Sequence, residues 1–412
     1  MRASGHFCLE AAILNPLSPD RCFYIDRGQL VFDGSGRIVY CGRRRKRGGK
    51  VRMIQAPQEA VIIPGLVDGH SHLSQYHVRG RTGHTLIQWL RQYVFPEEAR
   101  FQNRDYANSV AKRYYRKLLE NGVTSVALYA NTAVGVEAAV SQAEVNGLRV
   151  VVGYTLMDRN VPSYIRQRPD KVLRECQVLS ERIGALKDER IRFALNPRFA
   201  PATTPQFMEA IGRLAKDRGL YLQTHLSENP SEVRLVAKLF PDIENYTSVY
   251  EKFGLLTSKT LLAHCIHLSP RERELIKRRG CSVVHCPSSN LFLHSGRFPI
   301  EHWQDYPKLC LGSDVGAGPS FSLLDTMRDA YYVNQQSPER LFWLATMGGA
   351  TALGIQEHTG NLLPGKQADF SVVTVGERRG KNGRELLSDL IFKWDQVRFH
   401  RVYIDGREVW PG

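Results

Sequence analysis

The sequence predicts a (β/α)8 barrel, of the TIM-barrel type, joined to a small composite β-sandwich domain, and three observations lead to this α/β fold class. Eight short apolar, β-branched runs recur along the middle of the chain, at 61–67, 123–128, 150–156, 191–195, 220–224, 260–263, 282–285 and 309–312. Amphipathic stretches such as 106–121, 205–218 and 271–280 separate them. Strand-like segments with turns occupy both chain ends. Alternating strand and helix patterns are typical of βα units, and eight such units predict a barrel.

The two chain ends share one pattern of short strands and tight turns. Near the N-terminus these segments are 7–14, 22–25, 29–32 and 37–40, and near the C-terminus they are 368–375, 402–404 and 408–410. Because small isolated strand pairs are marginally stable, we expect the two groups to pair with each other. The expected division is a composite β-sandwich over residues 1–63 and 362–412, with the barrel over 64–361.

The composition is that of a globular protein without a membrane span. The 412 residues are 42% hydrophobic, and no stretch approaches the roughly 18 uninterrupted apolar residues that a span requires. The first ten residues lack a secretory-signal pattern and the eight scattered cysteines include no C-x-x-C pair, so we expect a cytoplasmic protein with reduced thiols.

The net charge of +15 is spread along the chain, with one dense basic run at 43–47. Two glycines follow this run, and strand-like segments flank it. We interpret the run as a solvated hairpin tip, and nucleic-acid binding is not expected despite the basic charge.

Candidate metal ligands stand at the carboxyl ends of the apolar runs, where the loops of such barrels build active sites. His70 and His72 follow the first run on an extended segment. Side chains two residues apart on an extended chain project to the same face, so both imidazoles can grip one ion. His225 ends the fifth run, with Glu228 three residues later.

Two interpretations of Glu228 are available. A glutamate close to a metal can take a proton from water and pass it to a substrate nitrogen. A glutamate at this position can also cap the helix that follows the strand.

His264 ends the sixth run and Asp314 follows the eighth. Asp314 can ligate a metal and accept a proton, whereas His264 can instead hydrogen-bond the attacking water. The fourth run contains no lysine to bridge two metals, which favours one ion per chain. Zinc suits mixed imidazole and carboxylate ligation with an open position for water. The ligand types leave iron(II) open as well.

These residues resemble those of the amidohydrolase superfamily, through Pro64-Gly65, His70-x-His72, His225, His264 and Asp314. More specific sequence motifs narrow the resemblance to the guanine deaminases within that superfamily. They are His72-Leu-Ser-Gln75-Tyr76, Phe95-Pro-Glu, Arg100-Phe-Gln-Asn103, Pro197-Arg198-Phe199, His225-Leu-Ser-Glu228-Asn229, Tyr246-Thr-Ser-Val-Tyr250 and His285-Cys-Pro-Ser-Ser-Asn290.

The resemblance implies a zinc-dependent deamination of guanine to xanthine and ammonia, usually by a homodimer. It implies one zinc per chain, held by His70, His72, His225 and Asp314. It implies catalytic roles for three residues. Glu228 shuttles protons, His264 orients the water, and Asp314 is both a metal ligand and a catalytic residue. It also implies a set of substrate contacts, formed by His72, Gln75, Arg198, Phe199, His225, Glu228 and Asp314.

Two other functions stay open. A related deaminase acting on adenosine, methylthioadenosine or similar amino-heterocycles would use the same metal centre. A catalytically silent binding protein on this barrel would be expected to have lost ligands, and none of the expected ligands is missing from the sequence.

Overall fold

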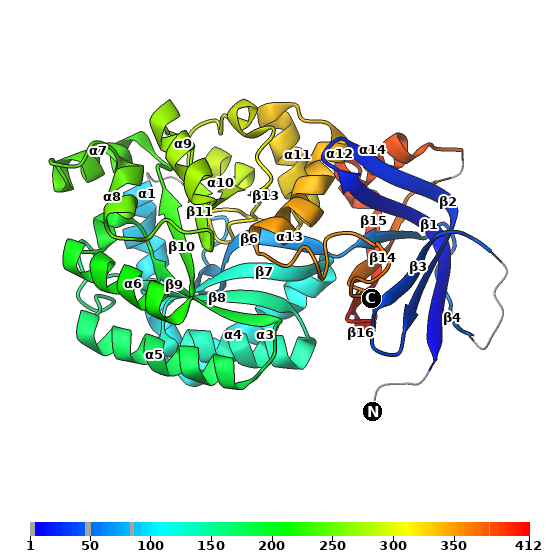
Figure 1. The fold of residues 1–412 in the computed structure, drawn as a ribbon, viewed down its shortest axis with the longest axis horizontal. Coiled ribbons are helices and arrows are strands. Elements are labelled where there is room, and N and C mark those ends of the chain that lie inside the picture. The colour runs from blue at the N-terminus through cyan, green and yellow to red at the C-terminus, as the bar shows by residue number, and fades with distance from the viewer. Residues whose placement is uncertain (1–4, 46–50, 83–85, 379) are drawn as a thin grey trace.

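The computed structural model describes residues 5–45, 51–82, 86–378 and 380–412. Figure 1 shows two parts, a barrel surrounded by helices and a sheet at one side in which strands from both chain ends lie together. The basic run at 43–47 is described only through residue 45, so its interpretation as a hairpin tip lies in part outside the described residues. Within the described ranges no helix is both long and apolar enough to cross a membrane.

The barrel consists of eight parallel strands in chain order. They are β6 (Leu66–His72), β7 (Val123–Ala130), β8 (Arg149–Leu156), β9 (Ile191–Pro197), β10 (Tyr221–Leu226), β11 (Thr260–His264), β12 (Ser282–His285) and β13 (Leu309–Leu311). The gap between the first and last strands is bridged just beyond β13, because Asp314 N–H donates to His70 O at 2.8 Å and His72 N–H donates to Val315 O at 3.0 Å. The expected barrel is therefore confirmed.

The first predicted strand differs from the observed one. The run at 61–67 divides into β5 (Val61–Pro64), which belongs to the terminal sheet, and β6, which begins at Leu66. Gly65 lies between them, where a Cβ atom would sit 2.1 Å from Thr124 Oγ1. His70 and His72 are consequently part of the barrel strand itself, whereas the sequence pattern placed them after it.

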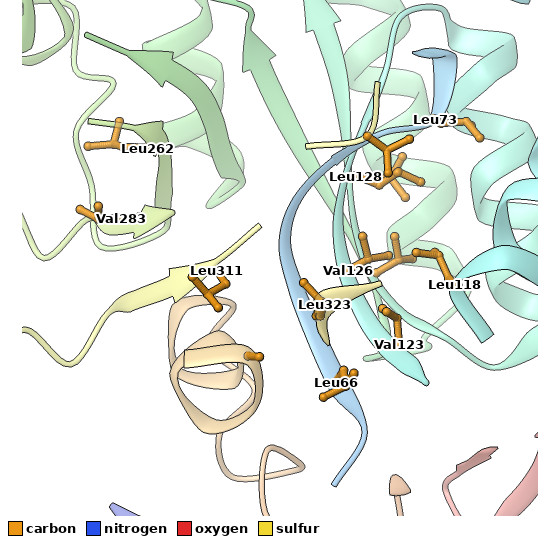
Figure 2. Packing of buried hydrophobic residues seen from close by; sticks show 14 of the residues in the cluster. Leu66, Leu73, Leu118, Val123, Val126, Leu128, Leu262, Val283, Leu311 and Leu323 are labelled. Atoms are coloured by element: carbon orange, nitrogen blue, oxygen red, sulfur yellow. The ribbon is translucent and has the colours of Figure 1, made fainter. Parts of the chain in front are cut away.

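Helices cover the outside of the barrel, and they include the three predicted ones. The main helices are α3 (Arg104–Glu120), α4 (Ala133–Asn146), α5 (Pro169–Ala185), α6 (Pro205–Arg218), α7 (Pro230–Leu239), α8 (Tyr246–Lys252), α9 (Pro270–Arg279), α10 (Pro287–Phe292), α11 (Leu323–Asn334) and α12 (Pro338–Trp343). Side-chain caps mark many of their beginnings, as Thr204 does for α6, and left-handed glycines such as Gly219 mark ends. Figure 2 shows Leu118 of α3 packed beside Val123 and Val126 of β7 in the main core.

The other helical segments lie near the strand ends and after the barrel. They are η1 (Leu73–Gln75), α1 (Leu86–Trp89), the π-helical turn η2 (Leu90–Val94), α2 (Phe95–Ala99), η3 (Arg100–Gln102), η4 (Ala200–Ala202), η5 (Ile300–Trp303), the π-helical turn η6 (Leu344–Gly348), α13 (Gly349–Ala352), α14 (Gly383–Phe392) and η7 (Trp394–Gln396).

The terminal strands form one mixed sheet in the order β16-β15-β14-β5-β1-β2-β3, and β4 pairs with β1. Their bounds are β1 (His6–Ser18), β2 (Arg21–Asp33), β3 (Ile38–Arg43), β4 (Val51–Ile54), β14 (Phe370–Val375), β15 (Val397–Ile404) and β16 (Arg407–Trp410). Phe32, Phe370 and Tyr403 pack together in its core. Both chain ends thus build one sheet, as the sequence predicted.

A buried ion pair joins this sheet to the barrel. Arg149, the first residue of β8, donates from Nε to Asp369 Oδ2 at 2.6 Å and also bonds Asp405. All eight cysteines lie within the described residues, and none forms a disulfide there.

Candidate metal centre and active site

Three imidazoles converge where β6 and β10 end. The Nε2 atoms of His70 and His72 lie 3.1 Å apart, and ligand atoms of these two residues and His225 all lie within 4.8 Å of one another. The His225 Nδ1 atom lies 2.7 Å from Arg198 O, which turns its other ring nitrogen toward the group. Burial holds the pKa of His72 at about 3 and that of His225 well below its usual value, so both rings are neutral ligands.

Asp314 brings a carboxylate to the same point. Its Oδ1 atom lies 3.2 Å from His70 Nε2 and 3.1 Å from His72 Nε2. Burial opposes ionisation of Asp314, but the two adjacent histidines hold its pKa well below the usual range. Asp314 adopts a left-handed backbone with φ of 48°, as His264 does with φ of 70°. Non-glycine residues in this conformation are uncommon and cluster at functional sites.

His264 lies beside this group, oriented by a fixed partner. Its Nδ1 atom is 2.9 Å from Asn290 Oδ1, an oxygen that can only accept, so the ring donates from Nδ1. The His264 Nε2 atom lies 3.5 Å from Glu228 Oε2 and 3.8 Å from Asp314 Oδ2. It is buried without a hydrogen-bond partner among the described residues. A water molecule between these three side chains would satisfy it.

Glu228 faces the same point and does not cap the following helix. The cap of α7 is formed by Asn229 and Glu232, and Glu232 Oε2 accepts from the backbone N–H of Glu228 at 3.0 Å. The capping interpretation of Glu228 is therefore wrong for this structure. Ser295 donates its hydroxyl to Glu228 Oε1 at 3.0 Å. Burial, with the charge of Asp314, raises the pKa of Glu228 to about 8.

A cavity opens in front of these groups. Its empty space, counted together with its open mouth, is about 390 Å³. It is lined by His72, Gln75, Leu86, Trp89, Leu90, Arg198, Phe199, His225, Glu228, His264, Leu293, Asp314 and Ala317. Every predicted site residue except His70 lines this cavity, and His70 contacts His72 and Asp314 behind it.

Arg198, Gln75 and Phe199 supply the polar and aromatic part of the wall. Arg198 Nη1 donates to both carboxylate oxygens of Glu98, at 2.8 and 2.9 Å, and Gln75 Nε2 donates to Glu98 Oε1 at 3.3 Å. Burial raises the pKa of Glu98, and the Arg198 charge opposes that rise. The wall therefore offers fixed hydrogen-bond donors and an aromatic ring to a flat polar ligand.

We compared the sequence and structure of this chain with those of known proteins, and the matches agree on one family. The amidohydrolase family model matches residues 61–409. The chain belongs to the amidohydrolase family. Guanine deaminases of Escherichia coli and Homo sapiens are 35% and 34% identical to it, each over 85% of this chain and 83% of their own length. A crystal structure of guanine deaminase from C. acetobutylicum with bound guanine in the active site matches with a TM-score of 0.92 and 28% identity, over 98% of this chain and 100% of that one. The resemblance found in the sequence is confirmed.

The ligand set of this amidohydrolase fits a divalent cation. Zinc ligands at about 2.0–2.2 Å in tetrahedral geometry lie roughly 3.3–3.5 Å from one another. The Nε2 and Oδ1 atoms of His70, His72 and Asp314 are separated by 3.1–3.2 Å, close to that spacing. Imidazole nitrogens that meet one another and a buried carboxylate at a single point are suited to binding a cation there.

Several supporting residues of this amidohydrolase site were not singled out from the sequence. Asp68 Oδ1 accepts from the backbone N–H of His70 at 3.2 Å and of Ser313 at 2.9 Å, and its Oδ2 accepts from the Ser313 hydroxyl. It thereby clamps β6 to the segment that carries Asp314. Glu98 directly follows the Phe95-Pro-Glu motif, and Asn290 ends the motif that begins at His285. Ser295 belongs to no such motif, because its role depends on the loop that brings its hydroxyl to Glu228.

Proposed function

We propose that this chain is a guanine deaminase, which hydrolyses the exocyclic C–N bond of guanine to give xanthine and ammonia. One observation carries the proposal: a buried carboxylate and an unpartnered imidazole nitrogen, Glu228 and His264, face the metal ligands at one end of a cavity whose described wall presents Arg198 and Gln75. The family and the named relatives support the same reaction.

The proposed metal ligands are His70, His72, His225 and Asp314. Zinc, one ion per chain, suits three imidazoles with a carboxylate, and iron(II) is the alternative. When bound, such an ion supplies Lewis-acid chemistry, because it lowers the pKa of a water molecule far enough for hydroxide to be available near neutral pH.

The remaining steps belong to side chains of this protein. Glu228 takes one proton from the attacking water and delivers it to ring nitrogen N3. It then takes the second proton from the hydroxyl added at C2 and delivers it to the amine, so the C2–N bond breaks, ammonia leaves and C2 keeps a carbonyl oxygen. Its raised pKa suits this exchange, since a group that titrates near neutral pH can both accept and donate. His264, with Nδ1 fixed by Asn290, holds the attacking oxygen through Nε2, and Asp314 accepts a hydrogen bond from it.

We assign substrate selection to Arg198, Gln75 and Phe199, which line the same cavity. The Arg198 guanidinium donates to the C6 carbonyl oxygen of guanine, and the Gln75 amide pairs with a ring-edge nitrogen. Phe199 covers one face of the ring. Adenine-type substrates carry an amine at C6. This amine is a hydrogen-bond donor and would face the Arg198 donors, so such substrates are disfavoured.

Finer assignments complete the proposal. We assign residues 1–63 and 362–412 to one domain and 64–361 to the barrel domain. The family resemblance supports a homodimer. From the sequence pattern we propose a cytoplasmic location, without a nucleic-acid or membrane partner. Sedimentation of the purified protein tests the dimer.

The deciding experiment follows guanine absorbance and ammonia release together, with xanthine identified as product. Adenosine and methylthioadenosine are tested in parallel at the same enzyme concentration. Equal molar loss of guanine and release of ammonia supports the proposal. Turnover of the nucleosides with guanine untouched contradicts it and favours a related deaminase.

A further inference from the structure

We infer that Glu98 is a specificity-determining positioning residue, which aims Arg198 and Gln75 at the substrate and cancels the Arg198 charge so that the pocket prefers a neutral purine to an anionic one. This inference rests on the proposed function and deepens it by naming the charge state of the ligand that the site selects.

The geometry sets Glu98 behind the two residues that line the cavity. It lies on α2, its side chain is fully buried, and Glu98 itself is absent from the described cavity wall. Its carboxylate receives both Arg198 Nη1 and Gln75 Nε2, at 2.8 and 3.3 Å. One carboxylate thus fixes two side chains from different parts of the barrel. Arg198 directly follows β9, and Gln75 belongs to η1. Glu98 acts on the substrate only through them.

The Arg198 guanidinium is held from two sides. Phe95, three residues before Glu98, places its ring 5.5 Å from the guanidinium carbon. Among the described contacts, Glu98 engages Arg198 through Nη1, so the other guanidinium nitrogens remain for a ligand in the cavity. A guanidinium fixed in this way presents its donors with little loss of rotamer freedom on binding.

The charge argument follows from burial. The Arg198 side chain is 4% exposed, and a buried cation without a counter-charge is costly. With Glu98 ionised the pair is neutral overall, and the cavity wall then offers hydrogen bonds without a net positive charge. A neutral base such as guanine gains those hydrogen bonds. The product xanthine is a stronger acid than guanine and forms an anion more readily. Because the Arg198–Glu98 pair carries no net charge, it does not attract this anion, and the product can leave.

Arg198 also links the substrate wall to the metal ligands. Its backbone carbonyl oxygen accepts from the backbone N–H of His225 at 3.1 Å and lies 2.7 Å from His225 Nδ1. A displaced Arg198 side chain leaves this backbone contact intact, because the two ends of the residue have separate partners. Loss of Glu98 should therefore change substrate binding and leave metal binding in place.

The test compares wild type with Glu98→Gln and Glu98→Asp, using xanthine and hypoxanthine as probes. Both lack the 2-amino group of guanine, and at mildly alkaline pH xanthine is largely anionic while hypoxanthine is mostly neutral. Glu98→Gln keeps a hydrogen-bond acceptor but removes the charge. It should improve xanthine binding relative to hypoxanthine about tenfold and raise the KM for guanine about tenfold, with a smaller change in kcat. Glu98→Asp keeps the charge and should keep the wild-type preference.

A matched control stands one residue away on the same helix. Glu97 is also largely buried, but it bonds Tyr106 and Arg100 on the outer side. Glu97→Gln should leave the preference and KM unchanged. If Glu98→Gln does not fold, the double variant Glu98→Gln/Arg198→Gln removes both charges, and it should bind guanine weakly without favouring xanthine.

Each outcome decides the matter. A xanthine-to-hypoxanthine preference in Glu98→Gln within twofold of wild type overturns the inference, as does an equal shift in Glu98→Asp or an anion preference in the double variant. Metal content equal to wild type in Glu98→Gln supports a role confined to the substrate. Wild-type protein that does not deaminate guanine overturns the proposed function instead, and the ligand preference is then still measurable by calorimetry.

Discussion

Asp68 offers the sharpest test of how the barrel holds its metal ligands. Its fully buried carboxylate accepts hydrogen bonds from His70 N–H, Ser313 N–H and the Ser313 hydroxyl. Asp68→Ala leaves these three donors without their acceptor, and a buried unsatisfied donor costs about 1–3 kcal/mol. Since the hydroxyl can rotate to another partner such as Ser71, we expect a loss of about 3–5 kcal/mol in the free energy of unfolding.

The companion variant Asp68→Asn separates geometry from charge. Burial raises the pKa of Asp68 to about 6, so its ionised form is only weakly favoured. The carbonyl oxygen of the introduced amide keeps both backbone hydrogen bonds, and the Ser313 hydroxyl can turn to accept from the amide nitrogen. The expected loss is about 1–2 kcal/mol. Metal affinity should fall about 10–100-fold in Asp68→Ala and less in Asp68→Asn.

Urea unfolding in the presence of a chelator measures the stability term without the contribution of bound metal. Asp33 is the matched control, because it also accepts from three donors, Ser35 N–H, Ser35 Oγ and Arg37 N–H, in a half-exposed turn of the terminal sheet. There water replaces the lost acceptor, and Asp33→Ala should cost about 1 kcal/mol. If Asp68→Ala lowers the free energy of unfolding no more than Asp33→Ala does, Asp68 does not hold β6 to the segment that carries Asp314.

Three further predictions concern the centre itself. Glu228→Gln should retain the metal and lose about 10²–10⁴-fold in kcat, measured by guanine turnover and metal analysis; undiminished turnover removes Glu228 from proton transfer. Asn290→Leu should lower kcat about 10–100-fold with KM little changed, because His264 loses the acceptor that fixes its tautomer; an unchanged kcat contradicts this role. Chelation should abolish turnover, and one equivalent of zinc per chain should restore it, whereas a requirement for two equivalents contradicts a single-metal centre.

Much of the fold could be predicted because strand patterns in a parallel barrel are nearly continuous apolar runs. Seven of the eight runs coincide with barrel strands to within two residues at either end. The exception, at 61–67, shows the limit of hydrophobicity as a signal. β5 and β6 are both fully buried, so their burial patterns are alike, and only Gly65 marks where the chain leaves one sheet for the other.

The residues of the candidate site could be predicted because they share one edge of the barrel. The rule that strand ends meet at one face brings His72, His225, His264 and Asp314 together without knowledge of distances. The interpretation of Glu228 was undecided in the sequence, since a capping glutamate and a catalytic one occupy the same position relative to a helix. The presence of Glu232, four residues later, resolves it, because a single helix start needs one such cap.

Residues that act through other residues could not be predicted, and Glu98 shows why. Glu97 and Glu98 are adjacent glutamates with the same local environment in the sequence, yet one bonds surface residues and the other bonds Arg198. Their directions are set by α2, which follows directly on the π-helical turn η2. A π-helical turn inserts an extra residue and rotates the following helix by about 100° relative to a regular α-helix. The insertion leaves no mark in hydrophobic periodicity over five residues, so which glutamate faces the substrate wall is decided by tertiary structure.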